Sequence, residues 1–367
     1  MLKYQNRDSW RQRDVLRLAH VKPVDDDHNA LYNWIVKGWE SVGEEPHDNP
    51  ALRQIWAAER LKNVNADQVA KMVKQYRIPR EAISSQYLND KEVAKVLLED
   101  MPLTALIRNL AANTRNGALH PLSTTTKEVV AKITDAEYLR KARIHPISIL
   151  SALRAYASGR GGRSNTTWTP IVQITDALNK AFYEAFGTLE KSDKRVVFGI
   201  DVSGSMANSQ VNGLSNLSAC EGAAVMAMSL MRTCPEYAAM AFNTRSQSLQ
   251  LSPVQRLDDV VNTISRMVGG GTDCSLPITW AIENNINADA VVVLTDSESW
   301  SGSRHPIEAI RDYRSKMNPK AKLIVVQMTA TSFSLVPDGQ QDKGYLNVVG
   351  LDSAVPQLIS DFLKEEI

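Results

Sequence analysis

The chain has 367 residues, of which 43% are hydrophobic and 23% are charged, so it can bury a large core and is long enough for two domains. Its 42 lysines and arginines nearly balance its 41 aspartates and glutamates, although residues 1–190 are mildly basic and the remainder is mildly acidic. No apolar run approaches the roughly 18 residues that cross a bilayer, and the first residues, MLKYQNRDSWRQRD, are polar, so we expect a soluble protein with no membrane partner.

The first half of the chain has apolar residues at helical spacing and no strand pattern. Prolines at positions 23, 50, 79, 102, 146 and 170 interrupt this spacing. The expected helices lie near residues 8–19, 28–39, 50–62, 66–76, 90–99, 102–114, 146–158 and 170–186. Pairs of helices with short polar breaks predict a helical-repeat domain, a HEAT-like α-solenoid, over residues 1–190.

The first expected helix carries basic residues on one side. Arg13, Arg17 and His20 share that side, whereas Val15 and Leu18 lie on the other. The full basic set in this segment is Arg7, Arg11, Arg13, Arg17, His20 and Lys22, with Lys3 nearby. Such a face can meet RNA phosphates, although a solvated polar face has the same pattern.

A second candidate surface lies in LTALIRNLAANTR. Arg108, Ala112 and Arg115 lie opposite an expected core stripe of Leu103, Ile107, Leu110 and Thr114. Small and basic residues together leave room for a sugar-phosphate backbone, but a face packed on a neighbouring helix fits equally well.

The segment KARIHP adds Lys141 and Arg143 as candidate RNA contacts. His145, in the same segment, is equally suited to hydrogen bonding at the start of the next helix. The tryptophans at positions 34, 39 and 56 sit in helical patterns, and we interpret them as core residues rather than base-stacking platforms.

From about residue 195 the pattern changes to alternating strands and helices. The runs RVVFGI, EYAAMAF, ADAVVVLT and AKLIVVQM predict buried strands, with helices near 212–233, 257–268, 275–286 and 306–317. This order predicts an α/β Rossmann-like domain over residues 191–367, with a parallel sheet covered on both faces. Its three cysteines form no CxxC pair, which argues against a zinc site or a disulfide framework and suits a cytoplasmic location.

Three loops of this second domain supply oxygen ligands. VVFGIDVSGSM places Asp201, Ser203 and Ser205 after the first strand, GGGTDCS supplies Thr272 beside Asp273, and VVVLTDSES supplies Asp296. Hydroxyls with one or two carboxylates suit Mg²⁺ or another hard divalent cation. A single DxSxS run could merely cap the next helix, but three such elements on one sheet edge favour a metal site.

Enzymatic alternatives fit the sequence less well. GIDVSGS and GGGTD look like phosphate loops of an actin or heat-shock ATPase, which stays an alternative, but about seventy residues separate them and the second does not follow a buried strand. The chain has no GxxxxGK[ST] loop and no GxSxG motif. We therefore expect no catalytic residues. The metal site could also belong to a protein-adhesion module that binds no RNA.

The three oxygen-bearing loops resemble the metal-ion-dependent adhesion site of von Willebrand factor A domains. Further segments resemble the Ro ribonucleoprotein family, which joins a TROVE helical-repeat ring to a von Willebrand A domain. They are RDSWRQRDVLRLAHVKP, DMPLTALIRNLAANT, KARIHPISIL, AFYEAF, GGGTDCSLPITWA, DSESWSGSRHPIEAIRDYRSKM and AKLIVVQMT. Gly204 stands where many members have alanine.

The resemblance implies a protein that binds Y RNA, or Y-like RNA, and the single-stranded ends of misfolded noncoding RNA, with an exoribonuclease as a further candidate partner. It also implies that the basic segment containing His20 contacts RNA. Full-length members have helical repeats ahead of the segment that matches RDSWRQRD, so about half of their ring is represented here. We expect copies of the chain to associate head to tail into a closed ring, with Trp10, Val15 and Leu18 as the uncovered end.

Overall fold

The structure is a computed structural model that describes residues 2, 6–38, 41, 43–162, 165–212, 214–234, 236–296, 301–330, 335, 344–352 and 354–366, without the side chains of Arg7, Ala66, Thr188 and Ser215. The chain forms two compact units. The first comprises Met1–Ala131 and Trp168–Gln173, and the second comprises Lys132–Thr167 and Ile174–Ile367. The boundary expected at residue 190 separates the helical part of the chain from the α/β part. The two compact units do not test it, so it stays a prediction.

The first unit begins with a short hairpin of β1 (Asn6–Arg7) and β2 (Trp10–Arg11). Its two turn residues, Asp8 and Ser9, have positive φ angles of 52° and 69°. Such a turn reverses the chain and cannot be part of a helix. The sequence-based expectation of a helix from residue 8, and of no strand in the first half, was therefore wrong at this point.

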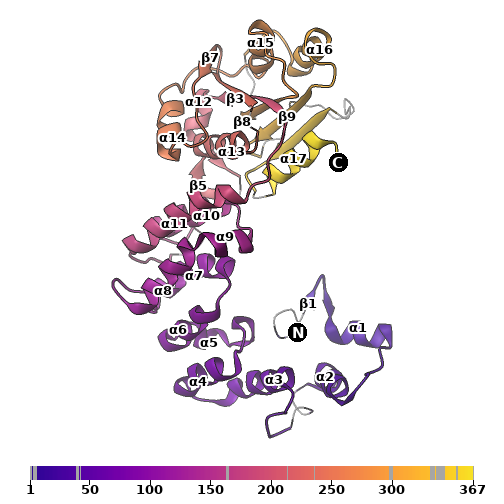
Figure 1. Ribbon diagram of the computed structural model, residues 1–367. Coiled ribbons are helices and arrows are strands. Elements are labelled where there is room, and N and C mark those ends of the chain that lie inside the picture. The colour runs from indigo at the N-terminus through magenta and orange to yellow at the C-terminus, as the bar shows by residue number, and fades with distance from the viewer. Residues whose placement is uncertain are drawn as a thin grey trace. The chain divides into compact units, whose positions relative to one another are not determined.

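Helices account for the rest of the first unit (Figure 1). They are α1 (Gln12–Ala19), α2 (Asp26–Lys37), α3 (Pro50–Arg60), α4 (Ala66–Tyr76), α5 (Ser85–Leu88), α6 (Lys91–Asp100), α7 (Leu103–Arg115) and α8 (Thr124–Thr134), which runs into the second unit. Asp25, Asn49 and Asp90 cap α2, α3 and α6 by accepting backbone hydrogen bonds. Helices α5 and α8 were not predicted.

The second unit begins with three helices, α9 (Ala136–Ala142), α10 (Pro146–Ala157) and α11 (Val172–Ala185), of which α9 was not predicted. Helices α10 and α11 contact the α/β part that follows. Arg154 of α10 lies 3.0 Å from the Glu221 carboxylate, and the Tyr183 hydroxyl of α11 accepts a hydrogen bond from the Leu257 backbone N–H at 2.9 Å. The guanidinium of Arg232 lies over the Phe186 ring, 3.8 Å from its centre.

A six-stranded sheet forms the centre of the second unit, in the order β10-β9-β8-β3-β6-β7 (Figure 1). The strands are β3 (Arg195–Asp201), β6 (Glu236–Phe242), β7 (Ser246–Leu249), β8 (Ala290–Thr295), β9 (Lys322–Gln327) and β10 (Tyr345–Val349). All neighbours pair in parallel except β6 and β7, which are antiparallel. The predicted parallel α/β sheet is confirmed, with an antiparallel edge strand added.

Helices cover both faces of this sheet. Helix α13 (Ala219–Thr233) packs on β3 and β8 together with α14 (Leu257–Ser265) and α17 (Val355–Lys364), while α15 (Leu276–Glu283) and α16 (Pro306–Lys316) pack together on the other face. Between β3 and α13 lie α12 (Gly204–Asn208) and the hairpin of β4 (Gln210–Val211) and β5 (Leu214–Ser218). The helix expected from residue 212 begins at residue 219, because Ser218 and Glu221 form a capping box there.

Candidate functional site

The oxygen ligands expected from three loops lie at one edge of the sheet. Strands β3 and β8 are parallel neighbours, so Asp201 at the end of β3 and Asp296 after β8 emerge at the same edge. The loop that carries Thr272 is tied to this edge by backbone hydrogen bonds, from Gly204 N–H to the Gly270 carbonyl at 3.2 Å and from Gly269 N–H to the Val202 carbonyl at 2.8 Å.

Asp201 is fully buried, and both of its carboxylate oxygens accept hydrogen bonds. Oδ1 accepts from the Ser203 backbone N–H at 2.7 Å, and Oδ2 accepts from the Thr295 hydroxyl at 2.6 Å. Burial raises the pKa of Asp201 to about 6; the hydrogen bonds from Thr295 and Ser203 act in the opposite direction, and the charge of Asp296 raises the pKa further. Two carboxylates thus lie close enough for the charge of one to raise the pKa of the other.

Ser203, Ser205 and Asp296 present further oxygen atoms at this edge. The hydroxyl oxygens of Ser203 and Ser205 lie 3.1 Å apart. Asp296 is buried; its Oδ2 accepts from the Ser209 hydroxyl at a long 3.5 Å, and its Oδ1 has no hydrogen-bond partner among the described residues. A buried carboxylate oxygen without a partner needs an explanation, and a bound cation would provide one.

The donor set fits Mg²⁺, which prefers oxygen ligands and retains some of its waters. Ser203, Ser205 and Thr272 supply neutral oxygens, and Asp201 and Asp296 supply the charge. Within the described ranges, no group of three His, Cys, Asp or Glu side chains comes together, which excludes zinc-like clusters from this part of the chain. The three cysteines are free and buried.

Asp273 is hydrogen-bonded to the start of α15, and two further residues donate hydrogen bonds to the site aspartates. Asp273 accepts hydrogen bonds from the backbone and hydroxyl of Ser275 at the start of α15, at 3.0 and 2.7 Å. Sequence reasoning missed Thr295 and Ser209, which hydrogen-bond to the two site aspartates. Thr295 directly precedes Asp296 in the sequence and could have been found there, whereas Ser209 carries no signal.

The candidate RNA-binding residues of the first segment surround α1. Arg11, Arg17, His20 and Lys22 are exposed, and α1 has no buried residue. Arg13 is half-buried. The side chain of Arg7 and the whole of Lys3 lie outside the described residues, so their placement as RNA contacts stays a prediction.

The second candidate surface, on α7, has the expected two sides. Arg108 and Arg115 are exposed, while the stripe of Leu103, Ile107 and Leu110 is buried. Leu106 and Asn113 complete this buried stripe, and Thr114 lies only at its border.

Lys141 and Arg143 are exposed and belong to the second compact unit, whereas the other candidate RNA contacts belong to the first. The ammonium of Lys141 lies 3.1 Å from the Glu137 carboxylate. His145 takes the structural role that the sequence left open: its Nδ1 accepts a hydrogen bond from the Ile147 backbone N–H and caps α10.

Trp34 and Trp56 pack in the core of the first unit, and Trp34 also lines a cavity beside that core. Trp34 is buried, and Trp56 is half-buried against the core of the first unit, with its indole N–H donating to the Glu44 carbonyl. Residue 39 lies outside the described residues.

Two family models match the chain. The TROVE domain model matches residues 49–155, and the Ro60 vWA domain model matches residues 195–363. The second match covers both glycine-containing loops that suggested an ATPase. These loops therefore belong to a vWA domain and not to an actin or heat-shock ATPase fold.

Similar proteins share this organisation. The chain is 37% identical to the RNA-binding protein RO60 of Deinococcus radiodurans over its whole length, spanning 68% of that protein, and 34% identical to the RNA-binding protein RO60 of Caenorhabditis elegans, spanning 63% of it. It is also similar to the crystal structure of the Deinococcus radiodurans RO (RSR) protein, with a TM-score of 0.90 and 35% identity over the whole chain and 73% of that structure.

Proposed function

The chain belongs to the Ro60 family, and from this premise we propose that it is an RNA-binding protein, with no catalytic role of its own. The observation that carries the proposal is a set of exposed basic residues around α1, namely Arg11, Arg17 and Lys22. Helix α1 itself has no buried residue. Phosphate contacts by such residues supply sequence-independent affinity.

We propose Y RNA or Y-like RNA, together with single-stranded ends of misfolded noncoding RNA, as the ligands, and an exoribonuclease as a further partner. Sequencing the RNA that co-purifies with the protein from its source identifies the ligand. Recovery of only random messenger fragments would contradict the proposed class.

The triple variant Arg13→Ala, Arg17→Ala and Lys22→Ala tests where the affinity lies. We expect weaker binding to every RNA and a salt dependence that is shallower by about one logarithmic unit for each phosphate that the variant no longer neutralises. Fluorescence anisotropy with a labelled RNA, measured from about 50 to 300 mM salt, provides both quantities.

A matched triple variant controls for the loss of three charges. Lys180, Lys191 and Lys320 are exposed residues of the second unit, and replacing them with alanine should leave the salt slope unchanged. Equal slopes for both triple variants would show that the basic side of α1 is only a solvated surface. Tight binding of a protein ligand without any RNA affinity would instead favour an adhesion module.

The metal site supports a second role. We propose that Ser203, Ser205 and Thr272 hold Mg²⁺, with Asp201 and Asp296 acting directly or through bound water. The buried Oδ1 of Asp296, which has no hydrogen-bond partner among the described residues, supports this assignment. The ion would hold the loops together and present a coordination position to a carboxylate of a partner. A crystal grown with Mn²⁺ should show an anomalous peak among these side chains, and no peak there would contradict the assignment.

Self-association is the third part of the proposal. Trp10, Val15 and Leu18 expose 54%, 52% and 65% of their surfaces, and they lie close together in sequence at β2 and α1. Apolar clusters of this kind commonly mark interfaces. We propose that another copy of the chain covers them in a head-to-tail arrangement, which closes into a ring when the rotation between copies permits.

A further inference from the structure

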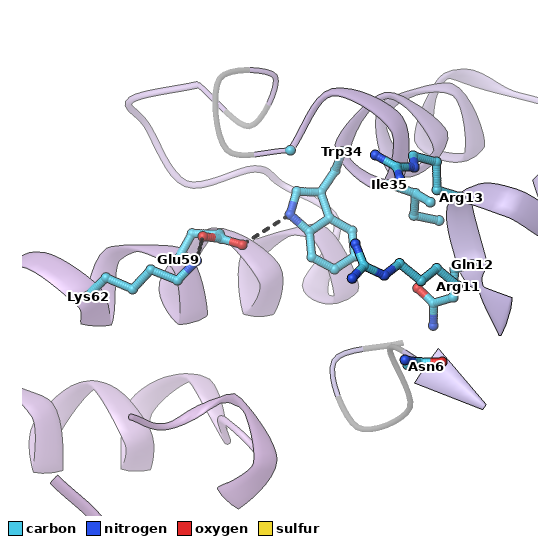
Figure 2. A pocket seen from close by; sticks show the side chains of 9 residues that line it. Asn6, Arg11, Gln12, Arg13, Trp34, Ile35, Glu59 and Lys62 are labelled. Atoms are coloured by element: carbon cyan, nitrogen blue, oxygen red, sulfur yellow. Dashed lines mark hydrogen bonds and ion pairs between the residues drawn. The ribbon is translucent and has the colours of Figure 1, made fainter. Parts of the chain in front are cut away.

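A cavity of about 500 Å³ lies in the first unit, between the β1–β2 hairpin, the start of α1, α2 and the end of α3 (Figure 2). Its lining residues are Asn6, Arg11, Gln12, Arg13, Trp34, Ile35, Gly38, Glu59 and Lys62. Figure 2 shows the Trp34 indole with Glu59 and Lys62 to one side and Arg11, Gln12 and Arg13 to the other. The volume is within the usual range of small-ligand sites.

The lining carries more positive than negative charge. Three cations, Arg11, Arg13 and Lys62, face a single carboxylate, Glu59. Glu59 is already engaged, since it accepts a hydrogen bond from the Trp34 indole N–H at 3.4 Å and forms an ion pair with Lys62. An anion is therefore the ligand that would balance the remaining charge.

Arg13 provides a more specific indication. Its Nε is buried and has no hydrogen-bond partner among the described residues. The nearest carboxylate oxygen with which it pairs, Oδ1 of Asp14, lies 3.9 Å away, which is too long for a hydrogen bond. A guanidinium N–H in this position can donate to a phosphate oxygen.

The rest of the lining suits a nucleobase better than a simple anion. Trp34 and Ile35 form an apolar wall, and Asn6 and Gln12 bring amide groups that can both donate and accept hydrogen bonds. Bases of single-stranded RNA are recognised by apolar contacts to their faces and hydrogen bonds to their edges. An acidic peptide would use the cations but would leave the apolar wall and the amides without a role.

We propose that this cavity binds one unpaired nucleotide of RNA, with its phosphate held by Arg11, Arg13 and Lys62 and its base against Trp34 and Ile35. The inference rests on the proposed RNA-binding function and extends it from a basic surface to a built subsite. It assigns a role to Lys62 and Ile35, which lie well beyond the basic segment that the sequence indicated.

Two variants separate the base from the phosphate. Ile35→Trp fills the cavity without changing charge, so affinity for a single-stranded oligouridylate should fall about tenfold while the salt slope is unchanged. Lys62→Gln removes a cation whose side chain is 66% exposed, so folding should be unaffected, and the salt slope should become shallower by about 0.7. Lys71→Gln, an exposed lysine of α4 outside the cavity, should match the wild type.

A titration with uridine 5′-monophosphate completes the experiment. Isothermal titration calorimetry should detect weak binding to the wild type and none to Ile35→Trp. Displacement of the mononucleotide by inorganic phosphate, without any effect of Ile35→Trp, would overturn the base subsite. If a hexaglutamate peptide displaces the RNA from the wild type but not from Ile35→Trp, the ligand of the cavity would be an acidic protein segment and not a nucleotide.

These experiments distinguish failure of the nucleotide subsite from failure of the RNA-binding function. If the wild type binds RNA with a clear salt dependence and both cavity variants behave like the wild type, the subsite is overturned and the RNA-binding function stands. If the wild type itself shows no salt-dependent RNA binding, both are overturned. Thermal melting of Ile35→Trp checks its folding, and Lys62→Gln keeps the test decisive if that variant unfolds.

Discussion

Asp201 and Asp296 are two buried carboxylates at one sheet edge, and their surroundings determine what they can bind. Asp201 uses both oxygens in hydrogen bonds within the protein, while Asp296 has one buried oxygen without a partner among the described residues. Serine and threonine hydroxyls add ligands but no charge. The site therefore combines two neighbouring carboxylates with preformed oxygen donors, which favours a divalent cation over a proton-transfer role.

Replacing Asp296 with asparagine should have opposite effects with and without the ion. In metal-free protein it removes the repulsion between Asp296 and Asp201, so stability should be unchanged or slightly higher. With Mg²⁺ at about 100 times its dissociation constant, the wild type should gain about 2.7 kcal/mol from binding, and the variant should gain little. Thermal melting with EDTA and with MgCl₂ measures both effects.

Asp289→Asn is the matched control for this charge removal. Asp289 precedes the amino end of β8, where it pairs with Arg195, whereas Asp296 follows the carboxyl end. The control should lower stability because the ion pair is removed, but it should retain the response to Mg²⁺. An Asp296→Asn variant that responds to Mg²⁺ as strongly as the wild type would contradict the proposed ligand set.

His145 has a half-buried ring that caps a helix. Nδ1 accepts a hydrogen bond from the Ile147 N–H, and the buried Nε2 has no partner among the described residues. Burial lowers the pKa of His145 to about 4, and the nearby Asp352 carboxylate opposes this effect. Protonation on Nδ1 would also remove the acceptor that caps α10.

This lowered pKa predicts a loss of stability in mild acid. At pH values above about 6.5 the folded and unfolded chains both hold a neutral ring, so the full stability is present. As the pH falls from about 6.5 to about 4, the unfolded chain takes up a proton that the folded chain does not, which lowers stability by at most about 3 kcal/mol. His145→Asn keeps a capping acceptor but does not titrate in this range.

Urea unfolding of the wild type and of His145→Asn at several pH values between about 7.5 and about 4 isolates this contribution from that of the carboxylates. The stability difference between the two proteins should shift in favour of the variant as the pH falls. A difference that stays constant across these pH values would show that His145 does not contribute to acid sensitivity.

At the scale of elements, the packing of β3 against α15 depends on a glycine. A Cβ on Gly199, in the middle of β3, would lie only 2.6 Å from Cβ of Pro277 in α15 and closer still to its Cγ. Both separations are shorter than real contacts allow, and the proline ring is held by the first turn of its helix. A glycine inside a buried strand therefore marks the place where a helix approaches the sheet closely.

Gly199→Ala should destabilise the second unit by about 1–3 kcal/mol, because the strand or the helix must shift to remove the clash. Thermal melting measures the loss. Gly187→Ala is the control, since an added Cβ there meets no described atom within 4 Å, and its melting temperature should be unchanged or slightly higher. Equal melting temperatures for Gly199→Ala and the wild type would mean that α15 lies farther from β3 than the structure places it.

Helices and strands could be predicted where the spacing of apolar residues is regular. They could not be predicted where turn residues or capping residues determine the start or end of an element. The β3, β6, β8 and β9 strands and most helices follow their apolar spacing. The β1–β2 hairpin was missed because its strands have two residues each and its turn uses Asp8 and Ser9 in left-handed conformations. The start of α13 was placed at residue 212 instead of residue 219 because the Ser218–Glu221 capping box was overlooked.

The two candidate sites also differ in how far the sequence alone could predict them. That the oxygen-bearing loops gather at one sheet edge could be predicted, because each of the three motifs is local; that they bind a cation stays a prediction. The cavity beside Trp34 could not be predicted, because segments near residues 6–13, 34–38 and 59–62 form it together and none carries a motif. Which side chains face a shared cavity is a property of helix packing, which periodicity alone does not contain.

At the scale of the whole molecule, the apolar residues around α1 predict the state of assembly. Exposed Trp10, Val15 and Leu18 are withdrawn from water if another copy covers them, which stabilises the assembly by roughly 25 cal/mol for each Å² buried. We expect light scattering at micromolar concentration to give a mass above the 40.7 kDa of one chain, and to approach one chain on dilution. Bound RNA should shift this equilibrium toward the larger species, because it can bridge neighbouring copies.

Val15→Ser with Leu18→Ser should return the mass to that of one chain, since the two substitutions remove apolar surface while α1 has no buried residue to disturb. Val254→Ser, at an apolar and still more exposed position in the second unit, should leave the assembly intact. If these residues instead rest against the protein's own neighbouring helices in solution, the wild type will have a mass near 40.7 kDa at every concentration, with and without RNA. That result would rule out the ring, while a fall in mass with Val254→Ser alone would move the interface to the second unit.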